Sequence, residues 1–400
     1  MRTPRRRRRW LAVLLLLVAV AALESIPGVP GHDQAALVAE LAVADAGGAA
    51  RTLPPFRVDA TGQPCAIIET RYGVGNHLLR NRAIGWYASI WPSYHALDAL
   101  SLASLVPGRT ACAEAVEADL SAIDANYWDE SPGPVPPAFD QGPNPFHVRS
   151  DPPRVDDSLW MGLALVAGYS ETGRRPFLDR AEAVLRLAGA NWDPRRGGVY
   201  WEDHTGRATN QYKSLVSNAP AVVLGADLYL DTGDARYLDR SRQIYSWLQA
   251  NLRDPRTGLY DDGVDDHTGV PKVKTTKLTY NQGIMLGAMV ALSTVDPKAY
   301  PLHDALRFAE GAMAYFAAHG SYGQPGFDSI WGEELLCAAG RAGDAGFTHA
   351  ALASVRAAIR RAPGGAGDLL GASSETALHE LARLPSSGYT RLPACDVRRH

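Results

Sequence analysis

Asp156 and Asp157 are adjacent carboxylates at the start of an apolar helical segment, in the stretch Val155-Asp156-Asp157-Ser158. Two such groups repel each other, which raises the proton affinity of one of them. The pair either caps a helix by accepting its free amide protons, or works as an acid and a base within one site. Capping is the commoner use of Asp at a helix start, so the rest of the chain must decide between the two.

The elements that position this pair form an internal repeat. The stretch Glu171–Arg180 returns as Asp231–Arg240, 60 positions later, and a weaker third copy covers Thr294–Tyr300. Each copy is a short turn between two helices, in which a Gly ends one helix and an Asp helps to start the next. The repeating unit is therefore a helical hairpin.

Apolar residues at helical spacing predict about a dozen helices, and no run of alternating residues predicts strands. Stacked hairpins bury a continuous core, and about six of them in one chain favour a closed double ring over an open solenoid. We therefore expect an all-α (α/α)6 barrel in a single domain over residues 83–384. The expected helices are Asp33–Asp45, Ala83–Val106, Thr110–Tyr127, Val155–Glu171, Pro176–Gly189, Ser214–Leu230, Ala235–Leu252, Leu278–Thr294, Ala299–Ala317, Phe327–Arg341, Asp344–Arg360 and Leu370–Leu384.

The repeat also predicts where polar residues gather. The first helix of each hairpin is the more apolar one and should be the inner helix. Three polar clusters stand at the starts of equivalent inner helices and should share one rim of the ring: Asp156-Asp157, Ser217-Asn218 and Thr279–Gln282. Helix capping explains one Asp or Asn for each helix, but neither the second Asp nor Tyr280-Asn281-Gln282.

The connections between hairpins are long and aromatic, at residues 128–154, 191–213 and 254–277. Connections of that length usually carry function. Aromatic rings beside amides and carboxylates suit a sugar, whose C–H faces pack on rings while its hydroxyls need donors and acceptors. Trp201, in a Gly-rich stretch, is the aromatic residue we expect to contact a sugar, although such rings also serve simply to hold loops against a core.

The acidic stretch Asp261–His267 has the outline of a metal motif. Magnesium with a diphosphate would need its ligands on a helix, whereas Gly258, Gly263 and Gly269 predict a loop. Calcium bound by oxygen ligands and a solvated acidic loop both stay open, and the solvated loop is the interpretation that we favour. No metal site and no cofactor are expected, because the chain has no HExxH, GxGxxG, P-loop or GxSxG motif.

An ordered set of motifs resembles glycoside hydrolase family 76, the endo-α-1,6-mannanases, over about residues 83–384. The motifs are Asp156-Asp157 with Trp160, Trp192-Asp193, Gly197–Trp201, Lys213 with Ser217-Asn218, the turns at Thr172-Gly173 and Thr232–Leu238, and Thr279–Gly283. The resemblance implies an (α/α)6 barrel that cleaves α-1,6-mannosidic bonds with retention of configuration. It implies Asp156 as nucleophile, Asp157 as acid/base, and an α-mannan substrate.

Retaining hydrolysis needs two carboxyl groups about 5–5.5 Å apart, one ionised and one protonated, which neighbouring residues at a helix start can supply. A transglycosylase with the same covalent intermediate and a non-catalytic mannan-binding protein are the alternatives. The residues expected to bind substrate are Trp91, Trp201, Lys213, Asn218, Asp262, Tyr280, Asn281 and Gln282.

The composition and the N-terminus bear on location and partners. The 400 residues carry a formal net charge of −3 with arginines spread among acids, which argues against a nucleic-acid partner. Arg5–Arg9 followed by an apolar stretch predicts a signal peptide over residues 1–23 with cleavage near Ala22; a twin-arginine route and an uncleaved anchor are alternatives. We therefore expect a secreted or extracytoplasmic monomer with an irregular region at 24–82, a C-terminal tail at 385–400 and no membrane contact beyond the export signal.

Four cysteines lack CxxC spacing, which argues against a zinc site. Export permits disulfides, and we favour Cys65 with Cys395, which would join the two ends of the domain. The alternative is that Cys112 and Cys337, on apolar helical stretches, are buried free thiols.

Overall fold

The computed structural model describes residue 68 and residues 72–81, 86–106, 111–144, 152–205, 210–362 and 368–395. All of these lie in one compact unit that spans Pro54–His400. The expected signal peptide at 1–23 and the helix expected at Asp33–Asp45 lie outside the described residues, as does Cys65.

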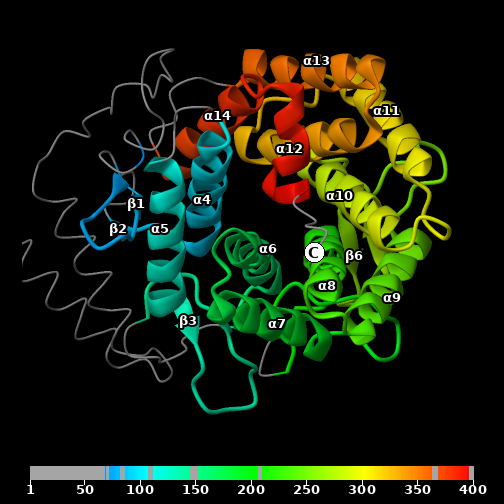
Figure 1. Cartoon of the computed structure of the whole chain (residues 1–400). Coiled ribbons are helices and arrows are strands. Elements are labelled where there is room, and N and C mark those ends of the chain that lie inside the picture. The colour runs from blue at the N-terminus through cyan, green and yellow to red at the C-terminus, as the bar shows by residue number, and fades with distance from the viewer. Residues whose placement is uncertain are drawn as a thin grey trace, which may run out of the picture. The chain divides into compact units, whose positions relative to one another are not determined.

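Six helices form a closed inner ring. They are α4 (Ile90–Ser104), α6 (Val155–Thr172), α8 (Ala219–Thr232), α10 (Thr279–Val295), α12 (Pro325–Ala342) and α14 (Leu369–Leu381). Each packs on the next, and α14 packs on α4, which closes the ring (Figure 1). The (α/α)6 barrel expected from the repeat is confirmed, with the more apolar helix of each hairpin on the inside.

The outer layer in the described part of the chain consists of α5 (Ala111–Tyr127), α7 (Arg175–Ala190), α9 (Ala235–Asn251), α11 (Leu302–His319) and α13 (Ala345–Arg361). Each packs against the inner helix that precedes it in the chain. Inner helices approach one another closely where glycine occurs. A Cβ on Gly283 of α10 would lie 2.9 Å from the Cα atom of Trp331 of α12, so a side chain there would separate the two helices.

The turns of the repeat end and start helices as expected. Gly173 and Gly233 adopt the left-handed conformation (φ 69° and 74°) directly after α6 and α8. Asp234 then caps α9 by accepting a hydrogen bond from the backbone N–H of Arg236. The hairpin boundaries are thus encoded locally by these turn residues.

Short strands occur where the sequence predicted none. Strand β1 (Arg80–Asn81) pairs with β2 (Trp86–Tyr87), and β3 (Trp128–Asp129) pairs with β4 (Ala138–Phe139). A three-stranded antiparallel sheet joins β5 (Tyr212–Ser214), β6 (Gly263–Asp265) and β7 (Lys272–Lys274), with Tyr212 opposite Asp265. The prediction was wrong here because strands of two or three residues are too short to show alternation.

Two predicted helix starts were also wrong. The helix expected from Ala83 begins at Ile90, because Trp86 and Tyr87 pair with β1 instead. The helix expected from Ser214 is preceded by a separate 3-10 turn, η1 (Leu215–Ser217), and α8 begins at Ala219.

Residues 386–395 of the C-terminal segment pack against the barrel. Two 3-10 turns, η2 (Ser386–Arg391) and η3 (Pro393–Cys395), pack on α12. Cys395 forms a disulfide with Cys337 of α12, with a Cα–Cα distance of 5.3 Å. The predicted Cys65–Cys395 pair is therefore wrong, because the returning segment places Cys395 beside α12. The free-thiol alternative is wrong too, since Cys112 is also disulfide-bonded.

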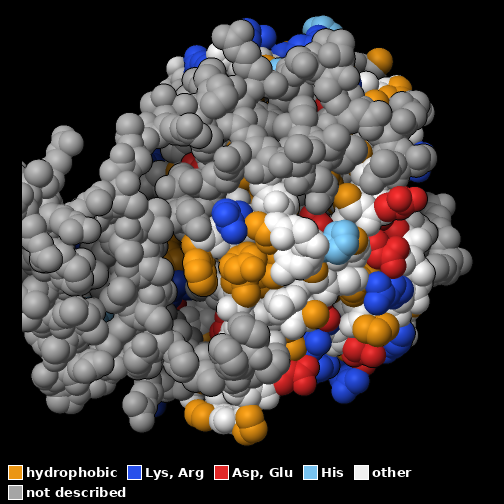
Figure 2. All heavy atoms as spheres, turned by 90° about the vertical axis from the view of Figure 1, so that its left-hand side faces the viewer, with side chains coloured by type: hydrophobic (Ala, Val, Ile, Leu, Met, Phe, Trp, Pro, Cys, Tyr) orange, Lys and Arg blue, Asp and Glu red, His pale blue; other side chains and the backbone are white. Residues whose placement is uncertain are grey.

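The surface in the described part of the chain is mixed in charge. Figure 2 shows acidic and basic side chains interspersed with apolar ones on one face of the molecule. None of the helices in the described ranges combines the length and the apolar character that crossing a bilayer requires.

Candidate active site

The acid pair lies in the first turn of α6, and both side chains are half-buried. Oδ2 of Asp156 accepts a 2.7 Å hydrogen bond from the indole Nε1 of Trp201. Oδ2 of Asp157 accepts a 2.8 Å hydrogen bond from the amide Nε2 of Gln141. No side chain caps the start of α6, where the N–H of Val155 instead donates to the carbonyl of Trp201. The neighbouring connections thus hold both carboxylates, and Asp156 also accepts hydrogen bonds from backbone N–H groups of its own helix turn.

Burial raises the pKa of both carboxyl groups. For Asp156, removal from water is the largest cause and the charge of Asp157 adds to it, while the hydrogen bond from Trp201 opposes both. For Asp157, burial raises the pKa to about 6, against the hydrogen bond from Gln141 and the charge of Arg154. Two acids that strongly oppose joint ionisation share one proton near neutral pH, which gives one acid and one carboxylate.

A third carboxylate, Asp262, belongs to the same group of side chains. Its two oxygens accept hydrogen bonds of 2.6 Å from the hydroxyl of Tyr212 and 3.0 Å from the amide of Asn281. The pKa of the Tyr280 hydroxyl is raised by burial and then by the charges of Asp262, Asp156 and Asp157. Tyr280 therefore lies among all three acids.

Aromatic rings pack beside the acids. Tyr280 stacks on Phe327 with ring centroids 4.0 Å apart, and its ring lies 6.4 Å from that of Trp91. Trp91 in turn lies 5.8 Å from Trp160 and is half-buried. The structure thus brings together Asp156, Asp157, Trp201, Asp262, Tyr280, Asn281 and Trp91 of the predicted set.

Three connections build this group in the same way. The backbone N–H of Phe139 donates to Ser158, that of Val199 to Asn218, and that of Tyr260 to Gln282. Ser158, Asn218 and Gln282 stand at matching places near the starts of α6, α8 and α10. Each connection is therefore fixed to the inner helix that follows it.

Two residues after each of these contacts comes a side chain of the polar group: Gln141, Trp201 and Asp262. Their backbone carbonyls accept hydrogen bonds from the N–H groups of Ile90, Val155 and Leu215, which begin α4, α6 and η1. Each connection is thus fixed to two successive inner helices, and the residue whose carbonyl makes the second contact presents its side chain at the rim. The repeat of the helices extends to the residues that they position.

Asn218 and Gln282 lie at the predicted rim but are fully buried in backbone contacts. Asn218 exchanges hydrogen bonds with the backbone of Val199 and donates one to the carbonyl of Ser214, and Gln282 exchanges hydrogen bonds with the backbone of Tyr260. They hold the connections that carry Trp201 and Asp262. Their side-chain amides are hydrogen-bonded within the protein, so the geometry does not support Asn218 and Gln282 as direct sugar ligands.

Lys213 is likewise buried away from the acid pair. Its ammonium group donates to Asp193 at 2.6 Å and to Asp266 at 2.8 Å. Burial alone would raise the pKa of Asp193, but the hydrogen bonds from Lys213 and two backbone amides lower it to about 2. Lys213 therefore joins two connections internally, and its burial keeps the ammonium group away from a substrate.

The carboxylates of the acidic loop are similarly occupied. Asp261 pairs with Lys277, Asp262 bonds Tyr212 and Asn281, and Asp266 also pairs with Arg196. Within the described ranges no three or more His, Cys, Asp or Glu side chains are arranged to hold one metal ion. The loop is thus built from ion pairs and hydrogen bonds between connections.

Gln141 and Tyr212 were missing from the predicted site. Both contact the acids directly, at Asp157 and Asp262. The repeat could have pointed to Gln141, which precedes Trp201 by 60 positions as Asp262 follows it by 61. Tyr212 carries no such signal, because it enters through the pairing of β5 with β6.

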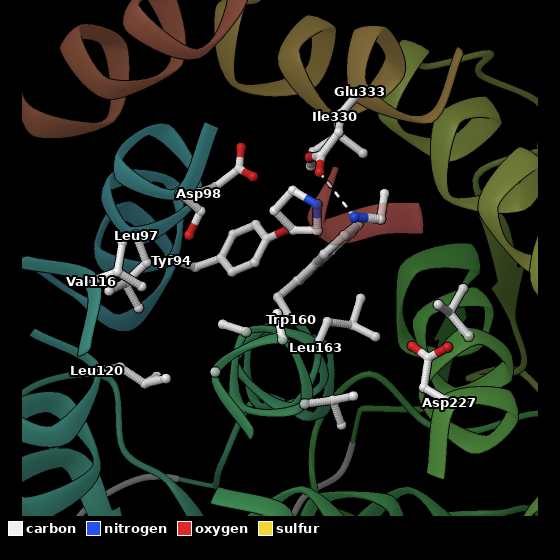
Figure 3. Close-up of a pocket in the computed structure, with 18 of the residues that line it drawn as sticks. Tyr94, Leu97, Asp98, Val116, Leu120, Trp160, Leu163, Asp227, Ile330 and Glu333 are labelled. Carbon is white, nitrogen blue, oxygen red and sulfur yellow. Dashed lines mark hydrogen bonds between the residues drawn. The ribbon is translucent and has the colours of Figure 1, made fainter. Parts of the chain in front are cut away.

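A second polar cavity lies inside the ring, where Figure 3 shows Asp98 and Tyr94 of α4 facing Glu333 of α12, with Trp160 of α6 beside them. Its volume is about 60 Å³, and none of the described residues that line it is Lys, Arg or His. Burial raises the pKa of Asp98, Glu333 and Glu334, and the backbone N–H of Ala394 donates to Glu333 at 3.0 Å. This acidic cavity is separate from the Asp156–Asp157 pair.

The closed double ring carries a carboxylate pair and aromatic rings at one rim. The sequence matches glycosyl hydrolase family 76 over residues 145–362, more than half of the chain. The chain belongs to this family.

Individual relatives cover smaller parts of the sequence. The mannan endo-1,6-alpha-mannosidase DFG5 of Saccharomyces cerevisiae is 28% identical over 174 residues, which is 40% of this chain and 37% of the yeast protein. The mannan endo-1,6-alpha-mannosidase DCW1 of the same yeast is 29% identical over 147 residues, 34% of this chain and 33% of that protein. The similarity thus spans well under half of these relatives.

Solved structures agree with the fold over most of the chain. The GH76A alpha-1,6-mannanase of Salegentibacter sp. HEL1_6 superposes with a TM-score of 0.67 at 21% identity, covering 80% of this chain and 97% of that one. The GH76 alpha-mannanase BT2949 of Bacteroides thetaiotaomicron gives 0.68 at 18% identity, covering 82% and 94%. At this identity the likeness establishes the (α/α)6 barrel.

Proposed function

We propose that the protein is a retaining glycosidase that cleaves α-1,6-mannosidic bonds, with Asp156 as nucleophile and Asp157 as acid/base. The observation that carries the proposal is the adjacent carboxylate pair, whose members are each held by one hydrogen bond from a rim connection, from Trp201 and Gln141. Burial keeps a proton on one member of the pair, and retaining cleavage needs one protonated and one ionised carboxyl group.

The reaction follows from these two roles. The carboxylate of Asp156 attacks C1 of the mannose as the C1–O bond to the leaving sugar breaks, and Asp157 donates its proton to that oxygen. The result is a covalent mannosyl ester on Asp156. Asp157, now ionised, then removes a proton from water, which attacks C1 and releases Asp156 as a carboxylate. The two inversions give net retention.

Relatives support the mannan substrate. Both yeast relatives are named mannan endo-1,6-alpha-mannosidases. A variant of the Salegentibacter enzyme in which two adjacent aspartates are replaced by asparagine is described as inactive, in complex with alpha-1,6-mannotriose. We infer that this chain binds α-1,6-linked mannose through Trp91, Trp201, Asp262 and Tyr280, the rings and the carboxylate that adjoin the pair, while the fully buried Asn281 holds Asp262.

We also infer that the protein acts outside the cytoplasm, with residues 1–23 as its export signal and residues 83–384 as its catalytic barrel. The Cys337–Cys395 disulfide supports this location, since such bonds persist in oxidising compartments.

The test is reducing-end release by the full chain from linear α-1,6-mannan, with α-1,2-linked mannan and β-1,4-linked mannan as controls. We expect oligosaccharides from the α-1,6-linked polymer alone. Chromatography of the products distinguishes hydrolysis from transfer, because transfer would yield chains longer than the starting oligosaccharide. No release from α-1,6-mannan would overturn the proposal.

A further inference from the structure

We propose that Gln141 is a positioning residue, which orients the carboxyl group of Asp157 and favours its ionised form. The inference rests on the proposed role of Asp157 as acid/base. The 2.8 Å hydrogen bond from the Gln141 amide is the side-chain contact that reaches Oδ2 of Asp157 from a different element of the fold. The residue comes from the connection between α5 and α6, outside every motif used above to identify the site.

The backbone around Gln141 is unusually well fixed for an exposed residue. Its carbonyl accepts a 3.1 Å hydrogen bond from the N–H of Ile90, at the start of α4. The preceding residue, Asp140, donates its N–H to the carbonyl of Tyr127, and Phe139 donates to Ser158 of α6. A loop tied at three successive residues can hold one side-chain amide in place without help from a substrate.

The equivalent positions in the next two repeats are used in the same manner. Trp201 donates to Asp156, and Asp262 accepts from Asn281, each from a backbone fixed by the same two hydrogen bonds. Gln141 and Trp201 thus supply one donor to each member of the acid pair. The two donors act on different carboxyl groups, so each favours the ionised form of its own partner.

The charged and titratable groups that face Asp157 define what Gln141 adds. Asp156 on the same helix opposes its ionisation, while the charge of Arg154 favours it. Tyr280 of α10 feels the charge of Asp157 and is held neutral by burial. Arg154 is itself paired with Glu202 and lies over the ring of Trp201, at 4.6 Å from its centroid. Gln141 is therefore a neutral donor in a site where the nearest cation is already engaged.

The acid/base must donate a proton in the first step and accept one in the second, so its pKa should lie close to the working pH. Burial alone moves a carboxyl pKa upward, which favours the first step and hinders the second. A donor that stabilises the carboxylate offsets this. Gln141 thus tunes and orients Asp157 without touching the reacting atoms.

The test compares wild type with Gln141→Ala and with the isosteric Gln141→Glu, which keeps the shape but cannot donate once ionised. Gln243→Glu, on the exposed face of α9, is the matched control. The full chain labelled with ¹³Cγ-aspartate is titrated by NMR, and the Asp157 signal is identified by its loss in Asp157→Asn. We expect the Asp157 midpoint to rise by about one pH unit in Gln141→Ala, as for loss of one hydrogen bond to a charge, and further in Gln141→Glu.

The kinetic readout is separate. We expect kcat on α-1,6-mannan to fall about tenfold in Gln141→Ala with little change in KM, and the alkaline limb of kcat/KM to move to higher pH. An unchanged Asp157 midpoint in both variants would overturn the proposal, as would a raised KM with unaltered kcat and pH profile. Because the titration needs no turnover, a shifted midpoint in a protein that does not cleave mannan would refute the proposed function and leave the role of Gln141 intact.

Discussion

Trp201 donates its indole N–H to Asp156 over 2.7 Å, from a connection that is held in turn by the buried amide of Asn218. The hydrogen bond favours the ionised form of Asp156, the form that attacks C1. Replacing Trp201 by Phe keeps a ring for sugar stacking and removes this donor. We expect the pKa of Asp156 to rise, the acidic limb of kcat/KM to move to higher pH, and kcat to fall about tenfold.

The pH profile of Trp201→Phe checks this, with Trp192→Phe in the same connection as the control, because Trp192 faces Arg240 and not the acid pair. An acidic limb at the wild-type position would contradict the role of the indole.

The two acids should respond differently to removal. Burial raises the pKa of both carboxyl groups, and the charge of Arg154 and the hydrogen bond from Gln141 oppose the rise at Asp157. With an activated aryl α-mannoside and azide, Asp157→Ala should give the α-mannosyl azide and Asp156→Ala the β-mannosyl azide. If the two variants gave the opposite products, Asp157 would be the nucleophile and Asp156 the acid/base.

Lys213 offers a test of a residue expected at the sugar and found elsewhere. Its ammonium is buried between Asp193 and Asp266, so Lys213→Met would leave Asp193 without its cation and Asp266 with Arg196 alone. We expect a loss of about 3–5 kcal/mol in the free energy of unfolding, measured by chemical denaturation. Lys272→Met, on the exposed strand β7, should change it little. Unaltered stability together with a raised KM would contradict this and indicate that Lys213 binds the substrate.

The acidic cavity predicts a pH-dependent stability. Burial raises the pKa of Glu334 in the folded protein above its unfolded value, so the folded state binds more protons and stability falls as pH rises above the unfolded value. Each unit by which the pKa of Glu334 in the folded protein exceeds its unfolded value corresponds to about 1.4 kcal/mol in the free energy of unfolding. Glu334→Gln should therefore raise Tm at pH 7–8, and the difference from wild type should vanish near pH 4.

The matched control is Glu310→Gln, an exposed acid of the outer helix α11. A Glu334→Gln variant that is no more stable than wild type at pH 8 would mean that Glu334 does not carry this ionisation cost.

The fold was predictable because its signals are local. Turn glycines such as Gly233, apolar inner helices and the 60-residue repeat together define the hairpins and their closure. The position of Asp156 and Asp157 in the first turn of an inner helix was predictable as well, while their catalytic role stays a prediction. The remaining errors concern how connections pack.

Whether an amide at the rim faces a sugar or a backbone depends on where a distant loop lies. Asn218 and Gln282 appear alike in sequence to Asn281, yet they bond Val199 and Tyr260 while Asn281 bonds Asp262. The disulfide posed the same difficulty, because Cys395 reaches Cys337 only when the chain after α14 turns back onto α12. Neither the amide hydrogen bonds nor the disulfide can be recognised from the spacing of residues along the sequence.

The most direct test of the central claim is ¹H NMR of the first products released from a linear α-1,6-mannan oligosaccharide, compared between wild type and Asp156→Asn. We expect wild type to release the α-anomer before mutarotation, and Asp156→Asn to lose at least about a thousandfold in kcat with an unchanged circular dichroism spectrum. Release of the β-anomer, or wild-type turnover in the variant, would contradict a covalent intermediate on Asp156.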